Sequence, residues 1–114
     1  MILNKTKNIV ITAEMRVCRS IPSKLRGLMF SRKITDTGLV FVFDKAERRG
    51  LHMLFVFFPI DLVFLDNRKR IIEIKEHFLP FTVYYPREKA KYVLELPDGA
   101  VKRSGTEIGD FIMF

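Results

Sequence analysis

Two carboxylates stand in apolar stretches of this sequence, where an ionised group is costly unless it is paired or hydrogen-bonded. Asp61 lies within the run FPIDLVF at residues 58–64, and Glu95 lies between two leucines. Either carboxylate, in a pocket lined by Phe and Met, could serve as a general acid or base. For Asp61, a structural hydrogen-bonding partner is the favoured interpretation. For Glu95 we favour exposure to solvent, on the strand face that carries Val93.

Arg26 and His52 are two further residues that could complete a site. Arg26 follows a predicted helix start and could pair with Asp61 or Glu95, or could bind an anionic ligand. The sequence does not decide between these roles, and an internal ion pair is favoured. His52 lies on an apolar strand face, which is typical of a hydrogen-bonded core histidine. The candidate ligand-binding residues are therefore Arg26, His52, Asp61 and Glu95.

Metal and cofactor chemistry finds little support in the residue pattern. His77 shares a strand face with Glu73 but not with Glu76, which leaves no ligand triad. Cys18 is the only cysteine, so the chain has neither an intrachain disulfide nor a thiolate cluster for zinc or iron–sulfur. Nucleophile-elbow, phosphate-loop, dinucleotide-binding and zinc-protease motifs are missing. We predict no metal site and no cofactor, and the sequence leaves open whether the protein is an enzyme.

Strands are the main elements that must position these residues. Apolar and polar residues alternate from Asn8 to Val17, which predicts a first strand. The polar turn at 66–70 predicts a hairpin that pairs 60–66 with 70–76. Runs of β-branched and aromatic residues predict strands covered on both faces at 38–43, 51–58 and 60–65. Further strands are predicted at 81–85, 92–96 and 110–114.

One short helix is predicted near residues 22–30, where Leu25, Leu28 and Met29 fall at helical spacing. One helix and about seven short strands, without a longer repeat, favour an antiparallel β-sandwich or a partly closed barrel. A chain of 114 residues has the size of one ordinary domain. Residues 1–114 are therefore predicted to form a single, mainly β domain.

Four short motifs occur in a defined order along the chain, and a Gly109-Asp110 pair follows them. They are Arg-Gly-Leu-Met at 26–29, the Gly-rooted strand GLVFVF at 38–43, Met53 followed by Pro59 and Asp61, and the strand at 92–96 followed by Gly99. With this ordered set the chain resembles the domain-of-unknown-function family number 192, over about residues 10–112.

The resemblance implies a mainly β, jelly-roll-like sandwich, but the family has no established activity to transfer. The chain departs from the family at 52–56, where it reads HMLFV and many members have Trp-Met-x-Asn-Thr. A role assigned to that asparagine therefore does not carry over.

An excess of positive charge bears on possible partners. Twenty Lys and Arg against thirteen Asp and Glu give a net charge of +7, which can attract nucleic acid, anionic lipid or acidic partners. Acidic residues interrupt the basic clusters, and the Phe residues lie in buried-looking strands rather than in exposed stacking positions. Solvated turns are therefore favoured over a nucleic-acid interface. The basic clusters lie at predicted turns near 45–49, 68–70, 87–91 and 102–103.

The pattern of apolar residues favours a cytoplasmic protein without membrane association. Residues 1–15 lack the charged, apolar and small-residue regions of a secretory signal. The longest apolar run, 51–65, contains His52, Pro59 and Asp61 and is shorter than the roughly 20 residues that a spanning helix needs.

Three functional hypotheses remain open at this point. The leading one is a non-catalytic module that binds a small ligand or a protein partner near Arg26, His52, Asp61 and Glu95. The second is an enzyme that uses Asp61 or Glu95 as an acid or base in an apolar pocket. The third is nucleic-acid binding through the basic turns. The sequence does not determine the oligomeric state.

Overall fold

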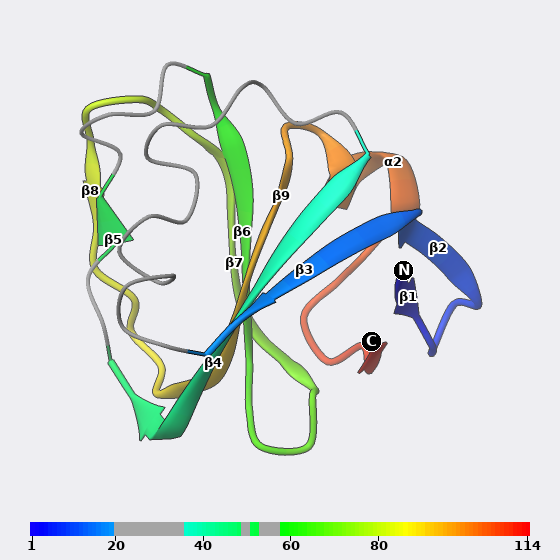
Figure 1. Cartoon of the computed structure of the whole chain (residues 1–114), viewed down its shortest axis with the longest axis horizontal. Coiled ribbons are helices and arrows are strands. Elements are labelled where there is room, and N and C mark those ends of the chain that lie inside the picture. The colour runs from blue at the N-terminus through cyan, green and yellow to red at the C-terminus, as the bar shows by residue number, and fades with distance from the viewer. Residues whose placement is uncertain (20–35, 49–50, 53–57) are drawn as a thin grey trace.

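The computed structural model describes residues 1–19, 36–48, 51–52 and 58–114, which form ten strands and one short helix (Figure 1). This arrangement confirms a mainly β chain. No helix within these ranges is long and apolar enough to cross a membrane. The elements are β1 (Ile2–Asn4), β2 (Ile9–Thr12), β3 (Glu14–Cys18), β4 (Thr37–Glu47), β5 (Leu51–His52), β6 (Ile60–Leu65), β7 (Ile71–Phe78), β8 (Val83–Tyr84), β9 (Ala90–Pro97), α2 (Ala100–Ser104) and β10 (Ile112–Met113).

A five-stranded sheet with the order β3-β4-β9-β6-β7 forms the centre of the molecule. It is open, with β3 and β7 at its edges, and is not a closed barrel. All neighbours are antiparallel except β3 and β4, which run parallel. The expectation of a fully antiparallel sheet is therefore wrong at this edge. A period-2 pattern carries no information on strand direction, and the chain between β3 and β4 is long enough for the crossover that a parallel pair needs.

The hairpin of β6 and β7 confirms the pairing predicted from the turn at 66–70. Leu65 pairs with Ile71 next to the turn, and Ile60 pairs with Phe78 at the far end. The Asp66 Oδ1 atom accepts hydrogen bonds from the backbone N–H groups of Arg68 (2.9 Å) and Arg70 (3.0 Å). An aspartate that bonds to backbone groups ahead of it is a frequent way of fixing a turn.

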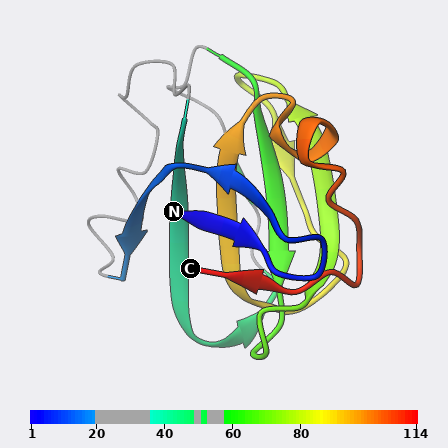
Figure 2. The same cartoon turned by 90° about the vertical axis from the view of Figure 1, so that its right-hand side faces the viewer.

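The strand predicted from Asn8 to Val17 is divided in the structure. β2 pairs with β1 in a small sheet of order β10-β1-β2, whereas β3 belongs to the central sheet. The chain bends at Ala13, whose N–H donates to Asp36 Oδ1 (3.0 Å). Alternation continues through the bend, so the pattern gave no sign of it. Figure 2 shows the small sheet crossing in front of the central one.

The predicted helix near residues 22–30 lies outside the described residues. The described helix, α2, has only five residues and was not predicted. It begins after Gly99 (φ 84°) and ends before Gly105 (φ 65°), and both of these glycines adopt left-handed conformations. A single helical turn is too short to produce a recognisable 3.6-residue period, so the sequence indicated only a turn at this point.

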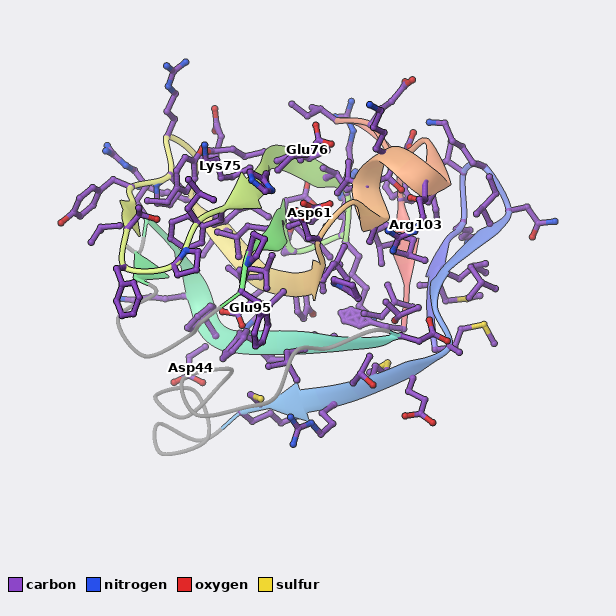
Figure 3. The ribbon with its side chains drawn as sticks, turned by 90° about the horizontal axis from the view of Figure 1, so that it is seen from above. Asp44, Asp61, Lys75, Glu76, Glu95 and Arg103 are labelled. Atoms are coloured by element: carbon purple, nitrogen blue, oxygen red, sulfur yellow. The ribbon has the colours of Figure 1, made fainter. Side chains whose placement is uncertain are left out.

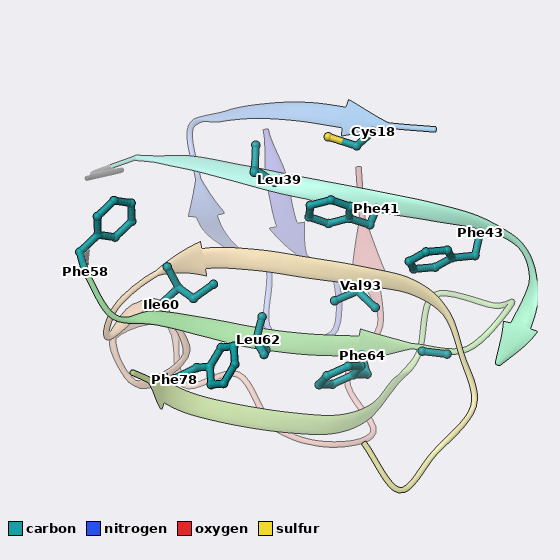
Figure 4. Packing of buried hydrophobic residues seen from close by; sticks show 11 residues of the cluster. Cys18, Leu39, Phe41, Phe43, Phe58, Ile60, Leu62, Phe64, Phe78 and Val93 are labelled. Carbon is teal, nitrogen blue, oxygen red and sulfur yellow. The ribbon is translucent and has the colours of Figure 1, made fainter. Parts of the chain in front are cut away.

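Both faces of the central sheet are covered, as the apolar runs predicted. One face, here called the aromatic face, carries Cys18, Leu39, Phe41, Phe43, Phe58, Ile60, Leu62, Phe64, Phe78, Ala90 and Val93 (Figure 4). The other, here called the aliphatic face, packs against residues of the small sheet and α2. This second cluster comprises Ile2, Ile11, Val40, Val63, Leu65, Ile71, Leu94, Leu96, Ala100, Val101 and Ile112.

Gly38→Ala is expected to destabilise the fold, because Gly38 lies where the small sheet approaches β4. A Cβ atom at this position would meet the Ile2 side chain and would lie 3.1 Å from Leu96 Cδ2. Both neighbours are completely buried, so we expect a loss of about 1–3 kcal/mol in the free energy of unfolding. Urea titration of the purified variant measures this loss.

Ile2→Val provides the matched control for Gly38→Ala, because it removes the methyl group that the new Cβ atom would meet. Alone it should cost about 0.5–1.5 kcal/mol. The double variant should be less destabilised than the sum of the two single variants, because the clash is relieved. Strictly additive effects would contradict the proposed contact.

Candidate functional site

Glu95 lies on the aromatic face in the middle of the central sheet. In the strand register it stands between Leu39 of β4 and Leu62 of β6. Both leucines are buried, and Val93 shares the face as the sequence predicted. The carboxyl group of Glu95 therefore projects from an interior strand among apolar side chains.

The Glu95 carboxyl group is buried, and its Oε2 atom has no hydrogen-bond partner. Part of the residue remains accessible, but this oxygen does not. Burial raises the pKa of Glu95 to about 8, so the group is mostly protonated at neutral pH. The expectation of a solvent-exposed Glu95 is therefore wrong. That expectation rested on the general rarity of buried glutamates. Because β9 lies between β4 and β6, side chains on its aromatic face are covered by their neighbours, and Glu95 is buried with them.

Two residues of β3 extend the surroundings of Glu95. Cys18 lies opposite Phe41 and Arg16 opposite Leu39 in the parallel register. Cys18 is a free, buried thiol. Burial raises its pKa and the charge of Glu95 contributes in the same direction, while Arg16 acts to lower it. Cys18 is thus close enough to Arg16 and Glu95 for both charges to act on its thiol.

Asp61 is buried on the opposite side of the sheet and has two hydrogen-bonding partners. Its Oδ1 atom accepts a bond from the His77 N–H (3.0 Å), and its Oδ2 atom accepts one from the Val101 N–H (3.0 Å). The carboxylate thereby joins the end of β7 to the first turn of α2. The structural role favoured for Asp61 is confirmed.

The structure does not bring the two candidate carboxylates together. Leu62, the residue after Asp61, pairs with Glu95, so the carboxylates belong to adjacent strands but project from opposite faces (Figure 3). Arg26 lies outside the described residues. His52 is described only through its backbone, which pairs with Val83.

Two further buried acids, Glu73 and Asp110, accept hydrogen bonds that fix nearby loops, and the sequence did not predict this role. Glu73 Oε1 accepts hydrogen bonds from the backbone N–H groups of Arg87 (2.9 Å) and Glu88 (3.0 Å). Its Oε2 atom accepts a bond from the Tyr84 hydroxyl. Burial, together with this bond, raises the pKa of Tyr84 to about 12. Glu73 therefore fixes the loop from β8 to β9, a role that strand alternation cannot indicate.

Asp110 is the second such acid. Its Oδ2 atom accepts hydrogen bonds from Lys7 Nζ (2.6 Å), Asn4 Nδ2 (2.9 Å) and the Glu107 N–H (3.0 Å). Burial acts to raise the pKa of Asp110, but the bonds from Lys7, Asn4 and Glu107 outweigh it and hold the pKa below its ordinary value. The Gly109-Asp110 motif was the one sequence signal for this site.

Glu95 therefore differs from the three other buried acids in the part of the chain that the structure describes. Asp61, Glu73 and Asp110 each have both a partner and a structural task. Glu95 alone among them has a buried oxygen without a hydrogen bond. A buried polar atom without a partner costs about 1–3 kcal/mol, and such an atom in a native protein calls for an explanation.

His77 forms the closest approach to a catalytic pair among the described residues. Its Nδ1 atom lies 3.0 Å from Asp98 Oδ1, and the His77 side chain is 61% exposed. No described group of three or more His, Cys, Asp or Glu residues is arranged to hold a metal ion. The pair is open to solvent, since the Asp98 side chain is also 33% exposed.

Comparison with known proteins identifies relatives over almost the full chain. The model of the DUF192 family, described as "Uncharacterized ACR", matches residues 2–114. A UPF0127 protein of Thermococcus sibiricus is 33% identical over 98% of this chain and 73% of its own length. The UPF0127 protein PH1112 of Pyrococcus horikoshii is 32% identical over 98% and 96%, respectively.

Two solved structures share the fold. A proposed transcription regulator from Sinorhizobium meliloti 1021 superimposes with a TM-score of 0.82 at 29% identity, over 87% of this chain and 79% of its own. A protein of unknown function from Novosphingobium aromaticivorans has a TM-score of 0.81 at 22% identity, over 88% and 74%. The second likeness bears on the fold alone.

Asp61→Asn is expected to destabilise the protein by about 2–4 kcal/mol. Asparagine retains one acceptor oxygen, but its amide group would face one of the two backbone N–H donors. The matched control is Asp98→Asn, which alters a partly exposed pair with His77 and should cost less than about 1 kcal/mol. Urea unfolding of both variants tests the difference, and equal losses would contradict the anchoring role of Asp61.

The stability of the protein is expected to fall as the pH rises from about 4.5 to about 8, the ordinary and the folded pKa of Glu95. Across this window the unfolded chain has released the Glu95 proton while the folded chain still holds it. Stability from this group is therefore complete below the lower value and lost through the upper one. The loss should be on the order of a few kcal/mol.

Glu95→Gln isolates this contribution, because an amide imitates the protonated acid and does not titrate. The difference in unfolding free energy between the variant and the native protein should grow from pH 5 to pH 8.5. Groups that both proteins share and that titrate in this range cancel in the difference. Parallel curves for the two proteins would refute a raised pKa of Glu95.

Proposed function

Because this chain belongs to the DUF192 family, a family of unknown function, we propose its function from its own geometry: it is a non-catalytic module that binds a small, largely apolar ligand. Glu95 is the polar anchor of the proposed site. The observation that carries the proposal is the buried Oε2 atom without a hydrogen-bond partner. A bound ligand would supply the missing partner.

The treatment of the other buried acids supports this reading. Asp61 and Asp110 accept two and three hydrogen bonds, respectively. The fold therefore satisfies its buried carboxylates where they are structural. A carboxyl oxygen without a hydrogen bond on an interior strand lowers the stability of the fold. A ligand that bonds to Glu95 would offset this loss.

The chemistry around Glu95 indicates the class of ligand. Ligand sites combine apolar and aromatic walls with a few polar groups that fix orientation. The aromatic face supplies Phe41, Phe64 and the leucines beside Glu95. A protonated carboxyl group can both donate and accept a hydrogen bond. The best-matched ligand therefore has an apolar body and one group, such as a carboxamide or hydroxyl, that also does both.

An enzyme that uses Glu95 as an acid or base is the alternative. A carboxyl group with a pKa of about 8 exchanges its proton near neutral pH, which acid–base catalysis requires. Asp61 and Glu95 lie on opposite faces and cannot act as a pair on one substrate. Binding without catalysis is therefore the simpler reading of a single unpaired carboxyl group.

Three finer predictions accompany this function. We propose that residues 1–114 act as one domain, that its connectivity is of the jelly-roll type, and that the protein works in the cytoplasm. The free thiol of Cys18 supports a reducing compartment. Similarity over residues 2–114 to a single family model supports one domain. Arg26 and His52 remain proposed contributors to the same site.

Benzamide, phenol and cyclohexanol are suitable probes, because each joins an apolar ring to one hydrogen-bonding group. We expect at least one of them at millimolar concentration to raise the melting temperature of the native protein by several degrees. Glu95→Leu should retain or increase the basal stability, because it removes the unsatisfied oxygen, and should abolish the ligand-induced shift. Differential scanning fluorimetry measures both quantities.

Two variants make this test specific. Glu95→Gln should keep much of the shift, because an amide also donates and accepts a hydrogen bond. Glu73→Gln is the control for altering a buried acid that already has partners: it should lower stability but preserve the shift. An unchanged shift in Glu95→Leu would exclude Glu95 as the anchor.

A further inference from the structure

A groove of about 580 Å³ lies on the side of the molecule away from Glu95. It is lined by Lys5, Thr6, Arg68, Lys69, Phe111, Ile112 and Met113. The C-terminal segment with β10 lies between the turn after β1 and the turn of the β6–β7 hairpin (Figure 2), and all three segments contribute lining residues. Its size is within the range of sites that hold small molecules.

The backbone around this groove is rigidly tied. Phe111 accepts a hydrogen bond at its carbonyl from the Lys5 N–H (2.8 Å), and its own N–H donates to Thr6 Oγ1 (2.8 Å). The Ile112 N–H donates to the Lys69 carbonyl (2.9 Å). These backbone groups are already paired on both sides of the strand, so an added peptide strand would find little to bond to here. Recognition at this groove therefore depends on side chains.

Three cationic side chains surround the groove: Lys5, Arg68 and Lys69. In the described part of the chain none of them has a carboxylate partner. The nearby acids have partners of their own, since Lys7 pairs with Asp110 (2.6 Å) and Glu107 (3.6 Å). Asp66 accepts hydrogen bonds from the backbone of its own turn. The groove is thus lined by three cations that form no ion pair with a described carboxylate.

An aromatic ring is accessible beside these cations. Phe111 is 41% exposed and Met113 is 50% exposed, whereas Ile112 between them is buried against the aliphatic face. Lys69 Nζ lies 3.9 Å from the centre of the Phe114 ring, which keeps this ammonium group over aromatic surface. A flat apolar group can therefore lie on Phe111 while an anionic group meets Lys5 or Arg68.

We propose that this groove binds a nucleotide unit, with the base stacked on Phe111 and the phosphate held by Lys5 and Arg68. Stacking on an exposed aromatic ring, together with a cationic track for phosphates, is the way proteins hold single-stranded nucleic acid without reading its sequence. The unit can come from a single strand or from a free nucleotide. The proposal is independent of Glu95, which lies on the aromatic face.

The concave shape of the groove favours a nucleotide over an anionic membrane surface as the ligand. A membrane-bound protein inserts projecting apolar side chains into the headgroup region, whereas Phe111 and Ile112 line the walls of a hollow. A planar base enters such a hollow readily. The test must therefore distinguish binding to phosphatidylserine vesicles from binding to nucleotides.

Fluorescence anisotropy with a labelled ten-residue oligothymidylate tests the proposal, with unlabelled adenosine monophosphate as competitor. Binding of the strand should weaken with salt, with a slope of log K against log salt of about −2, because Lys5, Arg68 and Lys69 are each expected to neutralise one of its phosphates. Competition by the monophosphate at micromolar concentration identifies a free nucleotide as the natural ligand. If adenosine monophosphate competes only at much higher concentration, the natural ligand is a single-stranded nucleic acid.

Matched variants give the test its specificity. Phe111→Leu should weaken binding about ten-fold, because it retains apolar bulk but removes the stacking ring, and Phe111→Tyr should bind like the native protein. The double variant Lys5→Ala with Arg68→Ala should flatten the salt slope to about −0.7. The charge-matched control, Lys89→Ala with Lys102→Ala, removes two exposed cations elsewhere and should leave the slope nearly unchanged.

Three results would overturn the proposal. The first is that neither nucleotide probe binds at low salt to a protein that melts cooperatively. The second is equal affinity in Phe111→Leu and Phe111→Tyr, or equal effects of the two charge-removing double variants. The third is that phosphatidylserine vesicles bind the native protein and the nucleotide probes do not.

Discussion

The constraint on which this structure depends is the burial of β6 and β9 on both faces of the central sheet. Every side chain of β6 is buried, and β9 lies between β6 and β4. Water has little access to the buried polar atoms of such strands, so each of these atoms must be satisfied by the protein or by something that the protein binds. Asp61 and Glu95 are the two acids on these strands, and the fold treats them in opposite ways.

Asp61 turns this constraint into a structural connection. Its two oxygens join the end of β7 and the start of α2 to the middle of the sheet, so one side chain holds three separate segments. Glu73 and Asp110 do the same for the loop before β9 and for the turn after β1. The scaffold is thus stabilised by buried acids with complete hydrogen bonding, against which the unpaired oxygen of Glu95 stands out. A stable frame around one unsatisfied group is what a preorganised binding site requires.

The sequence predicted those features that depend on local pattern. Unbroken apolar runs indicated β6 and the double-sided sheet, the turn at 66–70 set the hairpin register, and an acid within residues 58–64 had to have a partner. Ordered motifs also sufficed to indicate the family. Features that depend on distant contacts were not predictable: the parallel pairing of β3 with β4, the bend at Ala13, and the burial of Glu95 by strands that neighbour β9 only in space. The groove at Phe111 joins three segments far apart in the chain, and no local pattern marks such a meeting.

The pairing of β1 with β10 has a consequence for how the molecule is made. Leu3 pairs with Met113, and Asn4 pairs with Ile112, so the small sheet cannot form until residue 113 has left the ribosome. During synthesis the aliphatic face of β6 and β9 remains partly uncovered until both Ile2 and Ile112 can pack against it. Contacts of such long range slow folding, and exposed apolar strands invite association in the meantime. The nascent chain should therefore need protection from association until residues 112 and 113 are available to pair with β1.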